Sequence, residues 1–438
     1  MKILSKEEAR TIVNKILAYA TADETAVSIN GLNTGNIRYA RNTVSTSGES
    51  ENVSVAVTSV YGKRSGTATI NELDDASLQK TVKRSEEIAK LAPENPEYMP
   101  MLGKLDYTET KAFIDATGAI NPDIRAKAAI DSIQPCKQNA CVAAGYMEDN
   151  VGYNAIGNSK GFFGYNKFST LDFSVTVRTE DATGSGYASQ DYNDIRLLNT
   201  KAATEVALQK ARASVKAQAL EPGKYTVILE PLAAADLLQN MMRSMDARSA
   251  DEGRSFLSQK GGKTKLGEKL FDERVNIYSD PFNPLIPSAP FTADGRLQEK
   301  INWVEKGVVK NMSYSRFWAD KKGVKATPSP SGFIMMGGDK SLADMIKNTQ
   351  KGILVTRLWY IRSVDPQTLL YTGLTRDGTF FIENGKIKFP VKNFRFNESP
   401  VIMLNNIEEI GKEVRVGGSL VPALKIRDFT FSSLSDAV

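Results

Sequence analysis

The sequence predicts an α+β protein in which helix-on-antiparallel-sheet domains precede a mostly β C-terminal domain that is barrel-like or sandwich-like. An amphipathic helix and alternating strands open the chain, and a second cycle of helices and strands fills its middle. The second half then contains mainly short strands at regular spacing. A length of 438 residues suits two or three domains, which we predict over residues 1–105, 106–220 and 221–438.

The first segment begins with an amphipathic helix over residues 5–20. Ser5 and Glu8 have the spacing of a capping box, which satisfies free backbone amides of the first turn. Apolar residues then recur at helical spacing and form one face: Ala9, Ile12, Val13, Ile16, Leu17 and Ala20. A second helix begins after Asp74 and Asp75, and its predicted inner side carries Leu78, Val82, Ile88 and Leu91.

The strands between these helices are predicted to form an antiparallel meander. Their ranges are 25–30, 36–41, 52–61 and 64–70. Apolar and polar residues alternate from 53 to 58, which indicates that one face of the sheet is buried. Gly31 and Gly35 are predicted to lie in turns, and residues 61–66 are typical of a hairpin connection.

The remaining helices and strands are predicted from the same periodic placement of apolar residues. The middle segment is predicted to hold helices at 108–116 and 121–134, strands between 139 and 190, and an alanine-rich helix at 195–218. The third segment opens with a strand at 225–229 and a helix at 231–247. Its later strands are predicted at 299–305, 308–316, 352–362, 368–374, 379–383, 386–396 and 421–432.

Histidine is absent from the whole sequence, and this absence excludes several classes of enzyme site. Histidine is the commonest metal ligand and the usual general base near neutral pH. Ser-His-Asp triads, Cys-His pairs and every HExxH-type zinc site are therefore excluded. Carboxylate-only metal sites and Ser-Lys or Asp-based chemistry remain open.

Charge and cysteine content point to a cytoplasmic protein without a nucleic-acid or membrane surface. The net charge of +5 is spread along the chain without a run of five like charges, which argues against direct nucleic-acid binding. No segment approaches the ~18 apolar residues of a membrane span, and the start lacks a signal-peptide core. Cys136 and Cys141 match no zinc or redox spacing, so we expect two reduced thiols.

Two local clusters are candidate binding sites. Asp246, Asp251 and Glu252 follow the helix at 231–247 and could bind a hard cation, although a solvated helix end is the preferred interpretation. The Gly-Gly-Lys-Thr run at 261–264 ends like a phosphate-binding loop. Because Leu257 stands where the first glycine of that loop belongs, the run is predicted to be a surface turn.

The order of motifs after residue 225 carries a family resemblance. A Leu237-Leu238 pair on the predicted helix precedes Gln239, Asn240 and Ser244. Later, Tyr371-Thr372-Gly373 is followed by the run from Phe381 to Ile387, which matches a TG…ENGxI signature. In these features the chain resembles the TldD/PmbA family, also labelled modulators of DNA gyrase. Aligning on the Leu-Leu pair places Gln239, Asn240 and Ser244 where the family's catalytic branch carries the His, Glu and His of HExxxH.

The resemblance implies a member of the PmbA (TldE-like) branch, which lacks the zinc motif. The catalytic branch also uses a cysteine ligand near its C-terminus, and this chain has no cysteine after Cys141. We therefore expect no cofactor, no metal ligands and a catalytically silent subunit in proteolysis of peptides or unfolded segments. The expected partners are a zinc-bearing TldD-like paralogue, a second copy of the chain, or both, with a peptide held in a cleft by addition to a sheet edge.

Two alternatives stay open at this point. The chain could be an active peptidase with an unorthodox carboxylate metal site built near Asp236, Asp246 or Glu252. It could also regulate DNA gyrase, as the older family label implies.

Overall fold

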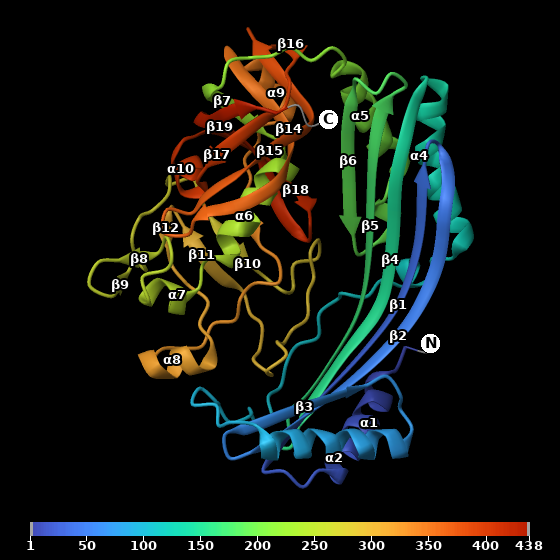
Figure 1. Ribbon diagram of the computed structural model, residues 1–438, viewed down its shortest axis with the longest axis vertical. Coiled ribbons are helices and arrows are strands. Elements are labelled where there is room, and N and C mark those ends of the chain that lie inside the picture. The colour runs from blue at the N-terminus through green and yellow to red at the C-terminus, as the bar shows by residue number, and fades with distance from the viewer. Residues whose placement is uncertain (1–2, 436–438) are drawn as a thin grey trace.

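Alternation of apolar and polar residues builds one long, curved antiparallel sheet from the first half of the chain. The computed structural model describes residues 3–435, and Figure 1 shows the sheet standing beside the C-terminal domain. Its strands run in the order β3-β2-β1-β4-β5-β6. Their bounds are β1 (Glu24–Ala40), β2 (Thr43–Tyr61), β3 (Arg64–Ile70), β4 (Cys141–Asn158), β5 (Phe163–Thr179) and β6 (Ser185–Tyr192).

Pairing of β1 with β4 joins the first two predicted segments in this sheet. The pairing continues from Ala26↔Asn158 to Tyr39↔Gly145. The division at residue 105 thus falls between strands of one sheet, and the domain limits themselves remain a prediction.

Gly31 and Gly35 do not lie in turns, because β1 continues through both of them. A Cβ at Gly31 would lie 2.1 Å from Cε1 of Tyr153, and one at Gly35 would lie 1.7 Å from Nη2 of Arg125. These large side chains cross the strand where it has no side chain of its own. Glycine here makes room for packing, so the predicted turns are wrong.

Helices cover one face of the sheet at both of its ends. They are α1 (Lys6–Tyr19), α2 (Asp75–Leu91), α3 (Asp115–Gly118), α4 (Pro122–Gln138), α5 (Thr200–Ala213) and a short 3-10 helix (Ile195–Leu197). The capping box predicted at Ser5 and Glu8 forms at the start of α1. Leu78 and Val82 of α2 are buried as predicted, but Ile88 and Leu91 are exposed because the buried side of the helix continues through Ser85 and Ala89 instead.

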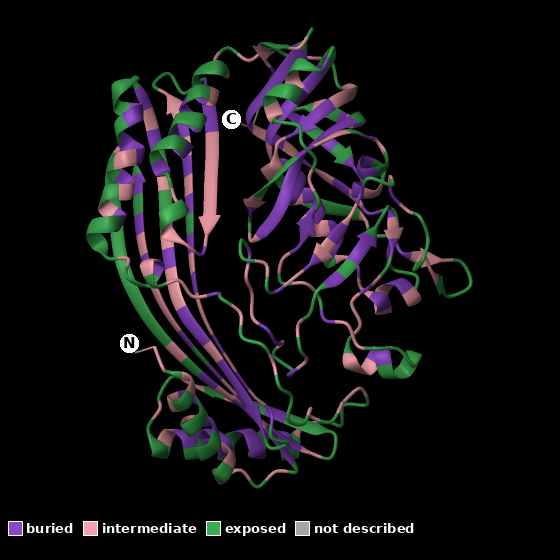
Figure 2. Ribbon diagram, turned by 180° about the vertical axis from the view of Figure 1, so that it is seen from behind, coloured by how far each residue is buried: buried purple, intermediate pink, exposed green. Residues whose placement is uncertain are grey.

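The buried residues of the strands divide the sheet into two faces. Figure 2 shows the long strands banded by burial, as expected when alternate side chains enter a core. One helix-covered core includes Val27 and Val55, and the other includes Tyr39 and Phe173. The opposite face of the sheet is turned toward the C-terminal domain (Figure 1).

The C-terminal domain is a mostly β structure whose main strands close on themselves. Its early elements are β7 (Gly223–Leu229), α6 (Pro231–Arg243), α7 (Ala247–Asp251), β8 (Ser258–Gln259), β9 (Lys263–Thr264), β10 (Ile277–Ser279), β11 (Ile301–Glu305), β12 (Val308–Val309), α8 (Arg316–Lys322), β13 (Ile334–Met335) and α9 (Leu342–Lys347). Its later elements are β14 (Lys351–Asp365), β15 (Leu370–Glu383), β16 (Lys386–Pro390), β17 (Phe394–Glu398), α10 (Pro400–Asn405), β18 (Ile407–Val416) and β19 (Ser419–Leu434).

Closure of this domain confirms the predicted mostly β, barrel-like architecture. The pairing runs β19-β17-β15-β14-β7, and β7 pairs back with β19.

The strand predicted at 308–316 is limited to Val308–Val309, and β18 was not predicted. The helix predicted at 231–247 divides into α6 and α7 because α6 ends at Arg243. Within residues 3–435 no helix combines the length and apolarity needed to span a membrane.

Candidate functional site

The helix α6 carries the positions singled out by the sequence and sits deep in the C-terminal domain. Pro231 occupies its first turn, where the missing N–H costs nothing. Its apolar face, including Leu237, Leu238 and Met241, enters the main core of the domain. The opposite side carries Asp236, Gln239, Asn240 and Arg243, which keep partial exposure or more.

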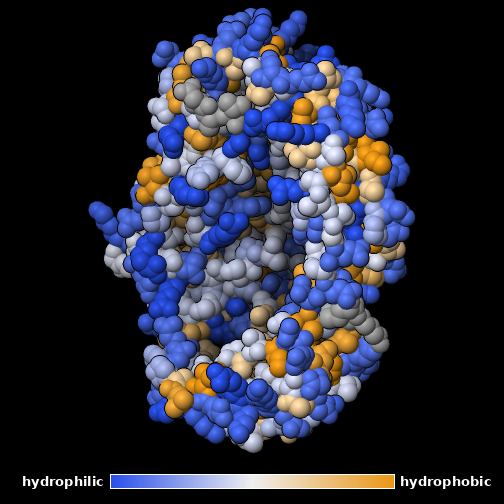
Figure 3. All heavy atoms as spheres, turned by 45° about the vertical axis from the view of Figure 1, so that its right-hand side comes forward, coloured by the Kyte–Doolittle hydropathy of each residue, from blue (hydrophilic) through white to orange (hydrophobic). Residues whose placement is uncertain are grey.

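The molecule is hollowed on one side, and a cavity between the long sheet and the C-terminal domain reaches this helix. Figure 3 shows the hollowed side as a depression lined largely by hydrophilic and neutral residues. Between β6, α5 and β18 a cavity of about 260 Å³ touches Pro231 at the start of α6, with Tyr187, Lys210 and Arg415 on its walls. The first turn of α6 is therefore accessible from this side.

The structure brings two of the three predicted positions together. The Ser244 hydroxyl donates to the backbone oxygen of Asn240 at 2.9 Å, and it lies 3.5 Å from the Tyr371 hydroxyl. The Asn240 side-chain amide donates to the backbone oxygen of Asp236 at 2.7 Å. The Gln239 amide is directed elsewhere and donates to the Gly417 backbone oxygen at 3.5 Å, in the turn between β18 and β19.

Asp236 has the most unusual acid–base behaviour on α6. Burial raises the pKa of its carboxyl to about 7, against a hydrogen bond from the Leu358 backbone and the charge of Arg357, which both favour the carboxylate. Arg357 is itself held by Asp377 through a contact of 2.5 Å. Asp236 can therefore carry a proton near neutral pH, which makes it the residue of this helix best suited to acid–base chemistry.

Ion pairs fix the start of the helix and the turn beside it. Lys210 of α5 contacts Glu230, the residue that precedes α6, at 2.6 Å, with both side chains largely buried. On β6, Asp191 accepts from Arg415 at 2.8 Å and from the backbone N–H groups of Gly417 and Gly418 at 2.9 Å each. These contacts position α6 and the β18–β19 turn against the central sheet.

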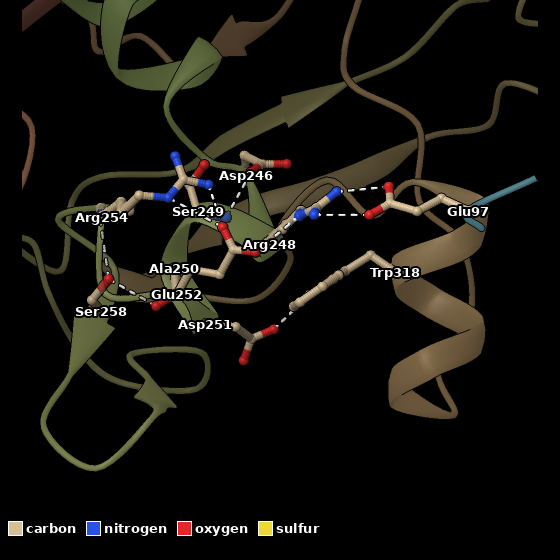
Figure 4. A network of polar contacts seen from close by, with 11 residues as sticks. Glu97, Asp246, Arg248, Ser249, Ala250, Asp251, Glu252, Arg254, Ser258 and Trp318 are labelled. Carbon is tan, nitrogen blue, oxygen red and sulfur yellow. Dashed lines mark hydrogen bonds and ion pairs between the residues drawn. The ribbon is translucent and has the colours of Figure 1, made fainter. Parts of the chain in front are cut away.

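The carboxylates considered as a cation site have separate structural roles. Figure 4 shows Asp246, Asp251 and Glu252 around α7. Asp246 caps α7 by accepting from the Ser249 backbone, and Glu252 pairs with Arg248 and Arg254. Asp251 accepts from the Trp318 indole N–H at 2.7 Å. Ordinary capping and ion pairing therefore account for their contacts.

The residues at the positions aligned with HExxxH do not fit a zinc ion. Zinc sites use thiolate, imidazole and carboxylate ligands, whereas Gln239, Asn240 and Ser244 offer neutral amides and a hydroxyl that bind backbone oxygens. In the part of the chain that the structure describes, no three His, Cys, Asp or Glu residues are grouped so as to hold a metal ion.

Sequence reasoning missed the residues that join α6 to the sheet. Asp191 and Gly417 are 226 positions apart, so no local motif connects them. The Gly417-Gly418 pair itself was a usable signal, because two glycines between apolar strands favour a tight hairpin. Both have positive φ, 55° and 70°, as such a turn requires.

Family models match the chain along nearly its whole length. They describe PmbA/TldA metallopeptidase domain 1 over residues 26–89, the central domain over 108–215 and the C-terminal domain over 222–433. The chain belongs to the TldD/PmbA family. A metalloprotease PmbA from Escherichia coli O157:H7 is 24% identical over 97% of this chain and 98% of its own length.

Solved structures share the fold of this TldD/PmbA chain. TldE from Thermococcus kodakarensis superposes with a TM-score of 0.87 at 17% identity, covering 97% of this chain and 99% of the relative. A candidate modulator of DNA gyrase from Thermotoga maritima gives 0.87 at 18% identity, covering 97% and 100%. These likenesses confirm the α+β architecture with its mostly β C-terminal domain.

Proposed function

We propose that this chain is a catalytically silent, PmbA/TldE-like subunit that takes part in the proteolysis of peptides or unfolded segments. One observation carries the proposal: the positions aligned with HExxxH hold Gln239, Asn240 and Ser244. In a zinc hydrolase, three protein ligands hold the metal and lower the pKa of its bound water. Neutral amide and hydroxyl groups supply neither the ligands nor a base.

The contacts of Asn240 support the same conclusion. Its position corresponds to the glutamate that serves as general base in the family's catalytic branch. An amide takes up no proton at neutral pH, and here its N–H is engaged by the Asp236 backbone oxygen. The side chain thus contributes to the helix rather than to proton transfer.

The chain's role in proteolysis would then be to hold substrate and complete an assembly. We propose a zinc-bearing TldD-like paralogue, a second copy of this chain, or both as partners in the cytoplasm. The cavity between β6, α5 and β18 reaches the start of the helix, which suits an extended peptide.

A second candidate is an active peptidase that relies on Asp236. The pKa of about 7 for this carboxyl supports it, because a general base works best near the operating pH. This candidate predicts peptide cleavage by the isolated chain that is lost in Asp236→Asn. The silent-subunit proposal predicts no such cleavage.

Co-purification combined with a peptide-degradation assay tests the proposal. The full chain is mixed with a zinc-bearing member of the family and an unstructured peptide, and each protein is also assayed alone. We expect a stable complex and cleavage only when the zinc-bearing member is present, with a rate that this chain increases. Cleavage by this chain alone that is abolished by a chelator would overturn the proposal.

A further inference from the structure

A second cavity contains no residue of α6 and lies where the long sheet faces the loop at 287–293 of the C-terminal domain. Its volume is about 310 Å³, at the lower end for ligand sites, so it suits a short segment of a ligand. Within the described part of the chain, none of the residues lining it is Asp, Glu, Lys or Arg. A ligand here is therefore recognised by neutral hydrogen bonds and apolar contact rather than by charge.

Three asparagines form a row across the floor of this cavity. Asn30 of β1 is directly opposite Asn154 of β4, which is directly opposite Asn166 of β5. Directly paired residues on adjacent antiparallel strands place their side chains on one face with Cβ atoms about 5 Å apart. The row thus presents side-chain amides at a regular spacing across three strands.

The hydrogen bonds made by Asn154 and Asn166 leave one side-chain oxygen and one side-chain nitrogen without a partner within residues 3–435. Asn154 donates to Oδ1 of Asn30 at 3.0 Å, so its own Oδ1 is left available. Thr110 donates to Oδ1 of Asn166 at 3.4 Å, so the Asn166 amide nitrogen is left available. Among the described residues neither group has a partner, although Asn166 is only 7% exposed.

We propose that this cavity binds a short extended stretch of polypeptide through its main chain. A backbone N–H of the ligand donates to Oδ1 of Asn154, and a backbone C=O accepts from the amide nitrogen of Asn166. Phe168, Phe291 and Ile156 supply apolar walls for small uncharged side chains. That the ligand is a peptide rests on the proposed function. The inference adds the position of the peptide in the fold and the side chains that bind it.

Binding of a peptide and of its N-methylated counterpart tests the site. The probe is a fluorescently labelled, uncharged hexapeptide of Ala, Ser and Val, measured with the full chain by fluorescence anisotropy. Methylating the backbone nitrogens removes the donors but keeps the side chains. Because a neutral hydrogen bond contributes about 1 kcal/mol, we expect roughly three- to tenfold weaker binding for each bond lost.

Variants of the two asparagines test whether the peptide binds in this cavity. Asn154→Leu and Asn166→Leu should each weaken binding of the parent peptide to a similar degree. Asn166→Asp keeps the size of the side chain and removes its donors, so it reports on the site even if the leucine variant unfolds. Asn36→Leu, on the same face of β1 but outside the cavity, should leave the affinity unchanged.

The outcomes separate this inference from the proposed function. Equal affinity for both peptides, no binding of either peptide, or unchanged affinity in folded Asn154 and Asn166 variants overturns the site. Binding of a neutral oligosaccharide in place of the peptide overturns it as well. Cleavage of the peptide by the isolated chain that a chelator abolishes overturns catalytic silence instead. In that case the cavity is still supported if N-methylation weakens binding and the Asn154 and Asn166 variants lose it.

Discussion

At the scale of single residues, burial raises the pKa of Asp236 and so decides which side chain of α6 can carry a proton near neutral pH. The neutral chemistry of Gln239, Asn240 and Ser244 follows from the sequence alone. The behaviour of Asp236 does not, because its pKa of about 7 results from burial in a folded domain. No local pattern around Asp236 signals that burial.

Asp236→Asn should abolish part of the pH dependence of stability. The carboxyl titrates near 3.8 when unfolded and near 7 when folded, so between these values the folded state binds more protons. The free energy of unfolding therefore falls as pH rises from about 4 to 7 and is level above that window. Chemical denaturation should find the variant more stable than the parent at pH 8 by up to about 4 kcal/mol, and similar at pH 4.

The comparison of parent and variant removes the contribution of other groups. Asp172, whose pKa burial and neighbouring acids raise to about 6, titrates in both proteins. If the two stability curves run parallel from pH 4 to 8, Asp236 is not protonated in the folded protein. The second candidate function would then lose its physical basis.

At the scale of secondary-structure elements, glycine indicates a turn correctly at some positions and wrongly at others. Gly31 and Gly35 were assigned to turns but lie within β1, where neighbouring side chains occupy the space of a Cβ. Gly261 and Gly262 form the predicted exposed turn between β8 and β9. Glycine alone does not distinguish these two uses, because tertiary packing decides which one applies.

The turn between β18 and β19 allows a matched test. Gly418 has φ of 70° and open space around its Cβ position, so only its left-handed backbone opposes a side chain. Gly418→Ala should lower the free energy of unfolding by about 1–2 kcal/mol, whereas Gly418→Asn should cost less than half as much because asparagine tolerates this conformation. Chemical denaturation of both variants measures the difference, and equal losses would contradict a left-handed turn.

At the scale of the whole molecule, contacts between distant segments set the position of the site. The sequence predicted the helix-on-sheet half and the barrel-like half, since both follow from local periodicity. It did not predict that β1 and β4 join in one sheet or that Asp191 holds the β18–β19 turn. Arg248 and Glu97, paired at 2.8 Å, likewise join segments 151 positions apart. Contacts between distant segments produce no repeating pattern of apolar and polar residues, so the sequence does not predict them.

Asp191→Ala should loosen the attachment of the C-terminal domain to the sheet. It leaves the Arg415 guanidinium, only 11% exposed, and two turn N–H groups without their carboxylate. We expect a loss of about 3 kcal/mol and faster hydrogen exchange in β6 and β18. Arg196→Ala, which breaks an exposed pair with Asp194, is the control and should cost less than about 1 kcal/mol. Similar losses in both variants would show that the Asp191 contacts do not hold these segments together.

Metal content tests catalytic silence most directly. The purified chain and a zinc-bearing family member are dialysed against zinc, then against metal-free buffer, and zinc per chain is measured by mass spectrometry alongside peptide cleavage. The account predicts far less than one zinc per chain here and one in the relative, with no cleavage by this chain alone. One tightly held zinc per chain, lost together with peptide cleavage on chelation, would contradict it.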